Sequence, residues 1–336
     1  MLTPPDLSAD TISAGLRAAY GLRIAQVTFL PLGADVNAAV YRVETDDGTP
    51  YFLKLKRAGF DEVAVGMPAW LRAQGIHAVM APLATLTHRL WTTAHGFAWI
   101  LYPFFEGHNG FASPLTDAQW VALGQTLQAV HATVLPTALA RRVPREDYSP
   151  QWRDSVTGFD RQIETRAYAD PVAQSLAAFW ITQRATIRSM VARADQLGKM
   201  LRQRACPFVL CHTDLHAGNV LLGAHDELVI VDWDEPLLAP KERDLMFVGG
   251  GVGAVWNAAR EAELFYQGYG PTDVDPFALA YYRYERIVAD LAAYGAQIFE
   301  AQGSVEDRAK GVRQVMGAFL PNDVVAIAHQ TYQQLP

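Results

Sequence analysis

Three features are scarce in this sequence of 336 residues: cysteine, long apolar runs and lysine. Its two cysteines, Cys206 and Cys211, are too few for a disulfide framework or a zinc site, and we expect them to be buried thiols in a reducing cytoplasm. The longest apolar run, residues 97–105, is far shorter than the roughly 20 residues that cross a bilayer. The start of the chain has no basic segment followed by an apolar one, so we expect neither export nor a membrane partner.

Basic charge is in short supply as well. The chain carries 28 lysine and arginine residues against 35 acidic ones, which gives a net charge of -7. Binding along a phosphate backbone needs a basic surplus on at least one face of a protein, so this balance argues against a nucleic-acid partner. A cationic partner remains possible. Lys54 and Lys56 are the only lysines that precede residue 199.

The order of predicted elements indicates an α+β protein, and the length suffices for roughly two domains with buried cores. A helix is expected at residues 10–19, and another at 62–74, where Gly66 and Pro68 predict a late or broken start. The first third is otherwise rich in strands, with a hairpin turn at residues 45–49. The predicted strands of this part are 26–30, 40–44, 51–55, 90–93 and 97–102.

Helices dominate the rest of the chain. Residues 103–110 are rich in turn formers and fit a link between two lobes. Thr116 and Gln119 form a capping-box pattern, which predicts the start of a helix with apolar residues at the helical period. A long helix is expected after Asp170, followed by two short strands at 208–210 and 228–231.

Polar residues around these two strands fit a phosphoryl-transfer site. Asp214 follows the first strand, Asn219 comes five residues later, and Asp232 ends the second strand. Phosphoryl transfer needs a carboxylate that positions the attacking hydroxyl and accepts its proton, and hard oxygen ligands for Mg²⁺. We predict Asp214 as the catalytic carboxylate and Asn219 and Asp232 as metal ligands. A single loop aspartate is more often a cap or turn former, but the whole spacing seldom arises by chance.

The pattern His-Thr-Asp-x-x-x-x-Asn, followed by a strand that ends in Asp, resembles the kinase-like aminoglycoside phosphotransferases. The resemblance implies a two-lobed protein-kinase-like fold, with a nucleotide-binding lobe over residues 1–104 and a mainly helical catalytic and substrate-binding lobe over 105–336. It also implies ATP and Mg²⁺ as cofactors. Several further stretches are similar to the spectinomycin phosphotransferases within this family: 52–56, 102–104, 148–152, 232–236, 238–247, 249–257 and 281–286.

A kinase-like ATP site requires a lysine on the third strand that contacts the nucleotide phosphates. Lys54 and Lys56 lie two residues apart and therefore on one face of the predicted strand, with leucines on the other face. The position of Lys54 corresponds to the lysine of the family, so we predict Lys54 as the phosphate ligand and Lys56 as a solvated surface lysine. The usual glutamate partner of this lysine stays open, and Glu62 is the nearest candidate.

Two other segments are predicted to contact the nucleotide. The loop between the first two strands contains Gly33, Asp35 and Asn37, and its small residues allow backbone N–H groups to approach the phosphates. In the interlobe link, the proline between Tyr102 and Phe104 has no N–H. A hinge that binds adenine would therefore use the Tyr102 C=O and the Phe104 N–H. A plain interlobe turn is the alternative.

The acceptor side is predicted from charge and shape. A cationic amino-sugar or aminocyclitol calls for carboxylates near the catalytic residue, and an aromatic ring could pack against it. Core packing is an equally good interpretation of the aromatic residues, and a solvated helix face is the alternative for the later acids. Arg243 and Asp244 fit an ion pair that anchors the catalytic loop. The candidate substrate-binding residues are Asp234, Glu235, Trp256, Tyr282, Glu285 and Asp290.

Together these features predict an ATP- and Mg²⁺-dependent O-phosphotransferase that acts on a hydroxyl of a small cationic aminocyclitol or aminoglycoside. The resemblance implies spectinomycin as the acceptor and antibiotic resistance as the role. One alternative is a kinase for choline, homoserine or another cellular alcohol. The other is a nucleotide-binding pseudokinase that serves as an interaction module, against which the intact set of Asp214, Asn219 and Asp232 argues.

Overall fold

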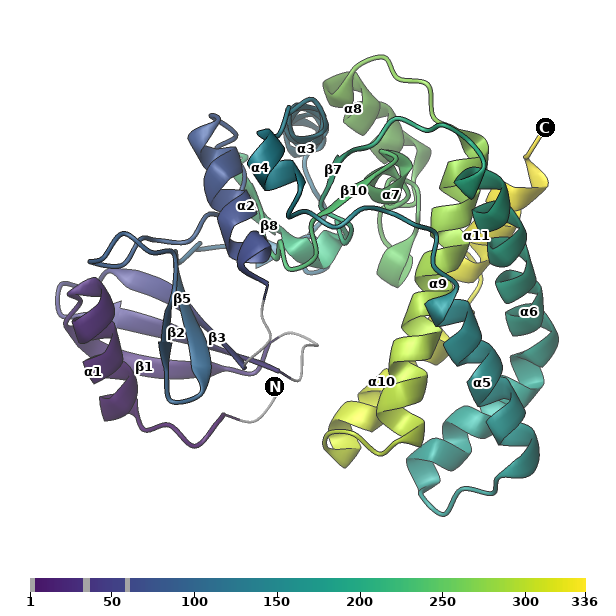
Figure 1. The fold of residues 1–336 in the computed structure, drawn as a ribbon, viewed down its shortest axis with the longest axis horizontal. Coiled ribbons are helices and arrows are strands. Elements are labelled where there is room, and N and C mark those ends of the chain that lie inside the picture. Colours follow the sequence, from purple (N-terminus) through teal and green to yellow (C-terminus); the bar gives the residue numbers. More distant parts are fainter. Residues whose placement is uncertain (1–3, 33–36, 58–60) are drawn as a thin grey trace. The chain divides into compact units, whose positions relative to one another are not determined.

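The computed structural model describes residues 4–32, 37–57 and 61–336 and contains both helices and sheets (Figure 1). Its residues pack into two compact units, one formed by residues 1–113 with 219–236 and the other by 114–218 with 237–336. The segment 219–236 belongs to the first unit because its strands bond to residues of that unit. This grouping differs from the lobes 1–104 and 105–336 expected from the sequence, and those lobe boundaries stay a prediction.

The first unit is built on an antiparallel five-stranded sheet with the strand order β1-β2-β3-β5-β4. Helix α1 (Ala9–Tyr20) packs on this sheet (Figure 1). The helix and the sheet share a core that includes Leu16, Leu53 and Trp99, each fully buried. The strands lie within a few residues of their predicted positions, as does the helix. Their bounds are β1 Ile24–Leu30, β2 Ala38–Thr45, β3 Pro50–Arg57, β4 Thr92–Ala94 and β5 Phe97–Pro103.

Helix α2 (Glu62–Ala73) corrects one expectation. It runs without a break through Gly66 and Pro68, whereas the sequence predicted a late or broken start. Asp61 caps its first turn by accepting a hydrogen bond from the Val63 N–H at 2.8 Å. Pro68 removes one backbone hydrogen bond, but it is itself buried in the apolar face of the helix, and we infer that this burial offsets the loss.

Two small sheets complete the strand pattern. In the first unit, β6 (His108–Asn109), β8 (Val220–Leu222) and β9 (Leu228–Ile230) pair in the order β6-β8-β9. In the second unit, β7 (Val209–Cys211) pairs with β10 (Leu237–Ala239). The sequence predicted β7 and β9 but missed β6, β8 and β10.

The second unit is mainly helical. Helix α3 (Asp117–His131) begins with the predicted capping box, in which the Thr116 hydroxyl accepts from the Gln119 N–H and the Gln119 side chain accepts from the Thr116 N–H. The expected long helix is α6 (Pro171–Arg202). The other helices are α4 Thr137–Ala140, α5 Gln151–Thr165, α7 Glu242–Leu245, α8 Ala259–Tyr269, α9 Pro276–Phe299, α10 Val305–Ala318 and α11 Val324–Gln333.

Helix α9 is the centre of the second unit. It packs against α5, α6, α10 and α11 (Figure 1). Its buried face holds large side chains such as Tyr281, Tyr282 and Tyr284. Within the described ranges, no helix combines the length and the apolar character needed to span a membrane.

Candidate active site

The third strand of the large sheet presents two lysines on one face. Strand alternation places Leu53 and Leu55 in the core beneath α1, where both are fully buried, and directs Lys54 and Lys56 to the opposite face. Both lysine side chains are largely covered, with exposed fractions of 13% for Lys54 and 17% for Lys56. The strand therefore holds two ammonium groups in a sheltered position within the first unit.

Two aspartates of the β9–β10 connection bind these lysines. Lys54 Nζ donates to Asp232 Oδ1 at 2.8 Å and to both oxygens of Asp234 at 3.0 Å. Lys56 Nζ donates to Asp234 Oδ2 at 2.7 Å. The expectation of a solvated Lys56 is therefore wrong, because the alternation that directs Lys54 toward Asp234 directs Lys56 there too. We call Lys54, Lys56, Asp232 and Asp234 the lysine–aspartate cluster.

Mutual attraction keeps this cluster charged. Burial alone would lower the pKa of Lys54, but Asp232 and Asp234 raise it above its ordinary value. Burial likewise works to raise the pKa of Asp234, whereas the two lysines hold it below its ordinary value. At neutral pH Lys54 therefore carries an ammonium group and Asp234 a carboxylate, and groups of these two kinds bind phosphate oxygens and divalent cations, respectively.

A short hairpin brings the predicted metal ligands to one end of a sheet. Val220 pairs with Ile230 across β8 and β9, and just beyond this pair the Val231 N–H donates to the Asn219 C=O at 3.0 Å. Asn219 is buried, and Asp232 follows Val231 with a φ of 65°. A positive φ is uncommon for a residue other than glycine and often marks a functional position. The amide oxygen of Asn219 and the carboxylate of Asp232, both hard ligands, are therefore carried by adjoining backbone positions.

The predicted catalytic carboxylate lies in the second unit. Asp214 Oδ1 accepts a hydrogen bond from Arg286 Nη1 on α9, and Asp214 Oδ2 lies 3.5 Å from His216 Nε2. Burial works to raise the pKa of Asp214, but His216 and Arg286 hold it well below its ordinary value. Asp214 is thus ionised at neutral pH and can accept a proton or a hydrogen bond from a hydroxyl.

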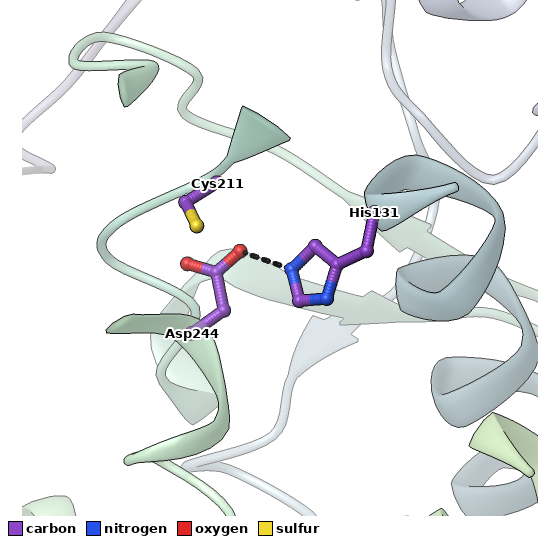
Figure 2. A group of neighbouring side chains, drawn as sticks. All are labelled: His131, Cys211 and Asp244. Carbon is purple, nitrogen blue, oxygen red and sulfur yellow. Dashed lines mark hydrogen bonds and ion pairs between the residues drawn. The ribbon is translucent and has the colours of Figure 1, made fainter. Parts of the chain in front are cut away.

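Asp244 anchors the backbone of the loop that carries Asp214. Its carboxylate, fully buried, accepts from the His212 N–H at 2.8 Å and the Thr213 N–H at 2.7 Å. His131 Nε2 lies 3.1 Å from the same carboxylate (Figure 2). Asp244 therefore anchors the loop by binding its backbone N–H groups. The neighbouring Arg243 lies over the ring of Tyr282.

His131, Asp244 and Cys211 also form a buried group of potential metal ligands, whose ligand atoms lie within 4.8 Å of one another (Figure 2). Each side chain already has hydrogen-bond partners, since His131 Nδ1 lies 2.7 Å from the Tyr269 hydroxyl and the Cys211 thiol points at two backbone carbonyls. Burial raises the pKa of Cys211 well above its ordinary value, so its sulfur stays a protonated thiol in these surroundings. We interpret this group as part of the loop anchor.

The structure buries three of the predicted substrate residues within the second unit. Glu285 forms an ion pair of 2.6 Å with Arg153. Trp256 packs edge-on against Trp120, and Tyr282 is almost completely covered. These contacts favour core packing, the alternative that the sequence left open for the two aromatic residues. Glu285 lies in a buried ion pair and not on the solvated helix face that was its alternative interpretation.

The other predicted residues lie in more open surroundings of the first unit. Glu62 is exposed at the first position of α2, and the structure gives Lys54 contacts with the two aspartates instead. Glu235 and Asn37 are exposed, while Tyr102 and Phe104 are half-buried at the end of β5 and just after it. Two loop positions predicted to contact phosphate lie outside the described residues: Gly33 and Asp35.

Comparison with known proteins decides the family. Residues 28–282 match the model of the phosphotransferase enzyme family. The chain belongs to this family. It is therefore a phosphotransferase enzyme with the kinase-like fold of its relatives, and the resemblance seen in the sequence is confirmed.

Solved structures refine this placement of the phosphotransferase. One is a spectinomycin phosphotransferase in complex with ADP and spectinomycin, 39% identical, with a TM-score of 0.92 and coverage of 98% of this chain and 100% of that chain. The AMP-bound complex of a spectinomycin phosphotransferase is 37% identical, with a TM-score of 0.88 and coverage of 96% and 98%. An amicoumacin kinase in complex with AMP-PNP, Ca²⁺ and Ami, 17% identical with a TM-score of 0.60 and coverage of 96% and 97%, shares the fold. No curated protein matches the sequence.

Sequence reasoning gave no role to several residues of the phosphotransferase that contact the predicted site residues. Arg286 and His216 reach Asp214, and His131 reaches the loop anchor. Arg286 lies 72 positions from its partner, so only the fold reveals the contact. For His216 a signal existed, since a histidine two residues after a loop aspartate can reach its carboxylate.

Proposed function

We propose that this enzyme transfers the γ-phosphoryl group of ATP to a hydroxyl of a cationic aminocyclitol, and that spectinomycin is its acceptor. The observation that carries the choice of acceptor is the 39% identity, over 98% of the chain, with a structure that holds ADP and spectinomycin. The nucleotides in both similar spectinomycin phosphotransferases support ATP as the donor.

Nucleotide binding is assigned to the lysine–aspartate cluster. Lys54 would exchange one of its two carboxylate partners for phosphate oxygens, as a compact ammonium group can. Asn219 and Asp232 are suited to hold Mg²⁺, because both present hard oxygen atoms from adjoining backbone positions. When bound, Mg²⁺ would supply positive charge that neutralises phosphate oxygens. The peptide groups of Tyr102 and Phe104 would contact the adenine.

Asp214 would act on the acceptor. Its carboxylate orients the hydroxyl and receives its proton while the hydroxyl oxygen forms a bond to the γ-phosphorus. The bond from that phosphorus to the bridging oxygen breaks, and its electron pair leaves with ADP. Because the pKa of Asp214 is held low, the carboxylate is a weak base, so we assign its main contribution to orientation.

Recognition of a cationic acceptor is assigned to carboxylates outside the core. Asp290 on α9 is nearly half exposed, and Glu235 is exposed. Trp256, Tyr282 and Glu285 would act indirectly, because their side chains are buried in the second unit. Asp234 would balance the charge of the two lysines.

A substrate panel tests this proposal. The enzyme is incubated with Mg²⁺ and ATP and with spectinomycin, several aminoglycosides or choline, ADP release is followed, and the mass of each product is measured. We expect ADP release and a gain of one phosphoryl group with spectinomycin. Phosphorylation of choline alone would assign the enzyme to metabolic alcohols, and ADP release with no phosphorylated product would contradict phosphoryl transfer to any acceptor of the panel.

A further inference from the structure

Arg286 connects two carboxylates of the second unit. Its Nη1 donates to Asp214 Oδ1, and its Nε donates to both oxygens of Asp290, at 3.1 and 3.0 Å. Only 22% of the Arg286 side chain is exposed, while Asp214 and Asp290 are exposed to 41% and 48%. The guanidinium group is therefore the sheltered centre of the triad, and the two carboxylates form its more open edges.

The guanidinium group is held by a residue of its own helix and by an aromatic ring. Asp290 lies four residues after Arg286 on α9, a spacing that places both side chains on one face of the helix. The ring of Phe247 lies on another side, with its centroid 5.6 Å from Arg286 Cζ. A planar, always-charged group fixed in this way can define the orientation of a carboxylate better than a flexible ammonium group can.

His216 faces the other oxygen of Asp214. The Gly218 N–H donates to His216 Nδ1 at 2.9 Å, which makes Nδ1 an acceptor and places the ring proton of a neutral imidazole on Nε2. That nitrogen lies 3.5 Å from Asp214 Oδ2. Positive or donor groups from the loop and from α9 therefore approach both oxygens of the predicted catalytic carboxylate.

We propose that Arg286 is a positioning residue for phosphoryl transfer, which orients the Asp214 carboxylate and keeps it ionised while Asp290 holds Arg286 in place. This inference rests on the proposed function. The charged and titratable groups around the contact are His216 on the loop and Asp290 and Tyr294 on α9. Unlike these groups, Arg286 supplies a fixed positive charge to Asp214 at every accessible pH.

Loss of that charge has a defined consequence. Without Arg286 the pKa of Asp214 rises, because burial then acts with less opposition. Activity depends on the ionised carboxylate, so the acid limb of the pH–activity profile should then move to higher pH. Loss of orientation should lower kcat even at pH values where Asp214 is ionised, because a small misplacement of a catalytic group can cost about 100-fold.

The test compares Arg286→Met and Arg286→Lys with the wild-type enzyme over a range of pH, using the acceptor that the wild type phosphorylates. We expect Arg286→Met to lower kcat by about 10- to 100-fold and to shift the acid limb of kcat/KM for the acceptor upward. Arg286→Lys should return the limb toward its wild-type position but recover only part of kcat. The dissociation constant for ATP should stay within about twofold of the wild-type value in both Arg286 variants. The matched control, Arg260→Met, removes an exposed arginine–aspartate pair elsewhere in the second unit and should change none of these values.

The outcomes separate this inference from the proposed function. Absence of wild-type turnover with every acceptor would contradict the proposed function. Wild-type turnover together with an unshifted acid limb in Arg286→Met would overturn only the role of Arg286. If Arg286→Met fails to fold, Asp290→Asn decides, because it leaves the guanidinium group but releases its helical partner. A reduced kcat with unchanged KM for the acceptor and unchanged ATP affinity would support the inference, because loss of an acceptor contact would raise that KM, and wild-type kcat would overturn it.

Discussion

Lys54 Nζ lies 2.8 Å from Asp232 Oδ1, which links the third strand of the large sheet to the residue that follows the β8–β9 hairpin. The two residues are 178 positions apart in the sequence. Because Lys54 is the predicted phosphate ligand and Asp232 the predicted metal ligand, this contact brings together the two charges that a nucleotide with its metal ion needs.

Replacement of Lys54 by methionine should remove a phosphate contact and leave the sheet intact, because methionine fills a similar volume. We expect kcat/KM for ATP to fall by about 100-fold, the effect typical of losing one charged donor in a reaction centre. Lys310→Met, at an exposed position on α10, is the matched control and should retain wild-type kinetics. Steady-state kinetics at varied ATP concentration measure both, and an unchanged kcat/KM in Lys54→Met would exclude this lysine from phosphate binding.

Asp232→Asn should weaken the response to magnesium. The amide keeps the size of the side chain but lacks the negative charge that attracts a divalent cation. We expect the Mg²⁺ concentration for half-maximal activity to rise by about tenfold or more. Asp226→Asn, in the exposed turn between β8 and β9, provides the control. A variant Asp232→Asn with the wild-type Mg²⁺ requirement would refute the assignment.

The sequence predicted those parts of the structure that have local causes. Alternation in β3 directs Lys54 away from the core, and the capping box at Thr116 sets the start of α3, so both could be recognised without a fold. Asp234 as the partner of Lys56 and Arg286 as the partner of Asp214 could not, since each pair joins distant segments. The local signal at Pro68 wrongly predicted a late or broken helix, because buried packing keeps α2 continuous there.

Glu285 was expected at the substrate, yet its ion pair with Arg153 predicts a role in stability. Arg153→Met leaves the buried carboxylate without its partner, and we expect the free energy of unfolding to fall by about 3–5 kcal/mol. The double variant Arg153→Met with Glu285→Leu should recover most of this loss, because no buried charge remains unpaired. Denaturant unfolding measures the effect, and a double variant less stable than Arg153→Met would contradict it.

Asp244 should make stability depend on pH. Burial works to raise its pKa, but His131 and His212 with its backbone N–H hold it below the ordinary value. A carboxylate whose pKa is lowered by folding contributes stability that is present above pH about 4 and is lost as the pH falls. Asp244→Asn offers one oxygen for two backbone N–H groups and should cost about 2–3 kcal/mol at pH 7.

The pH dependence of this difference is the control for Asp244. The gap in unfolding free energy between the wild type and Asp244→Asn should hold from pH 7 to about 5 and narrow as the pH falls through about 4 toward 3, because the carboxylate of the unfolded wild type then binds a proton while that of the folded protein stays ionised. A gap that stays constant over this range would show that the charge of Asp244 makes no contribution.

The central claim is that Asp214 acts on the acceptor hydroxyl, and turnover of spectinomycin by Asp214→Asn tests it most directly. We expect kcat to fall by at least about 100-fold, because the neutral amide orients the hydroxyl less well than the ionised carboxylate and accepts no proton, while the dissociation constant for ATP in the presence of Mg²⁺ stays within about twofold of the wild type. Phosphorylation of spectinomycin by Asp214→Asn at close to the wild-type rate would contradict the claim.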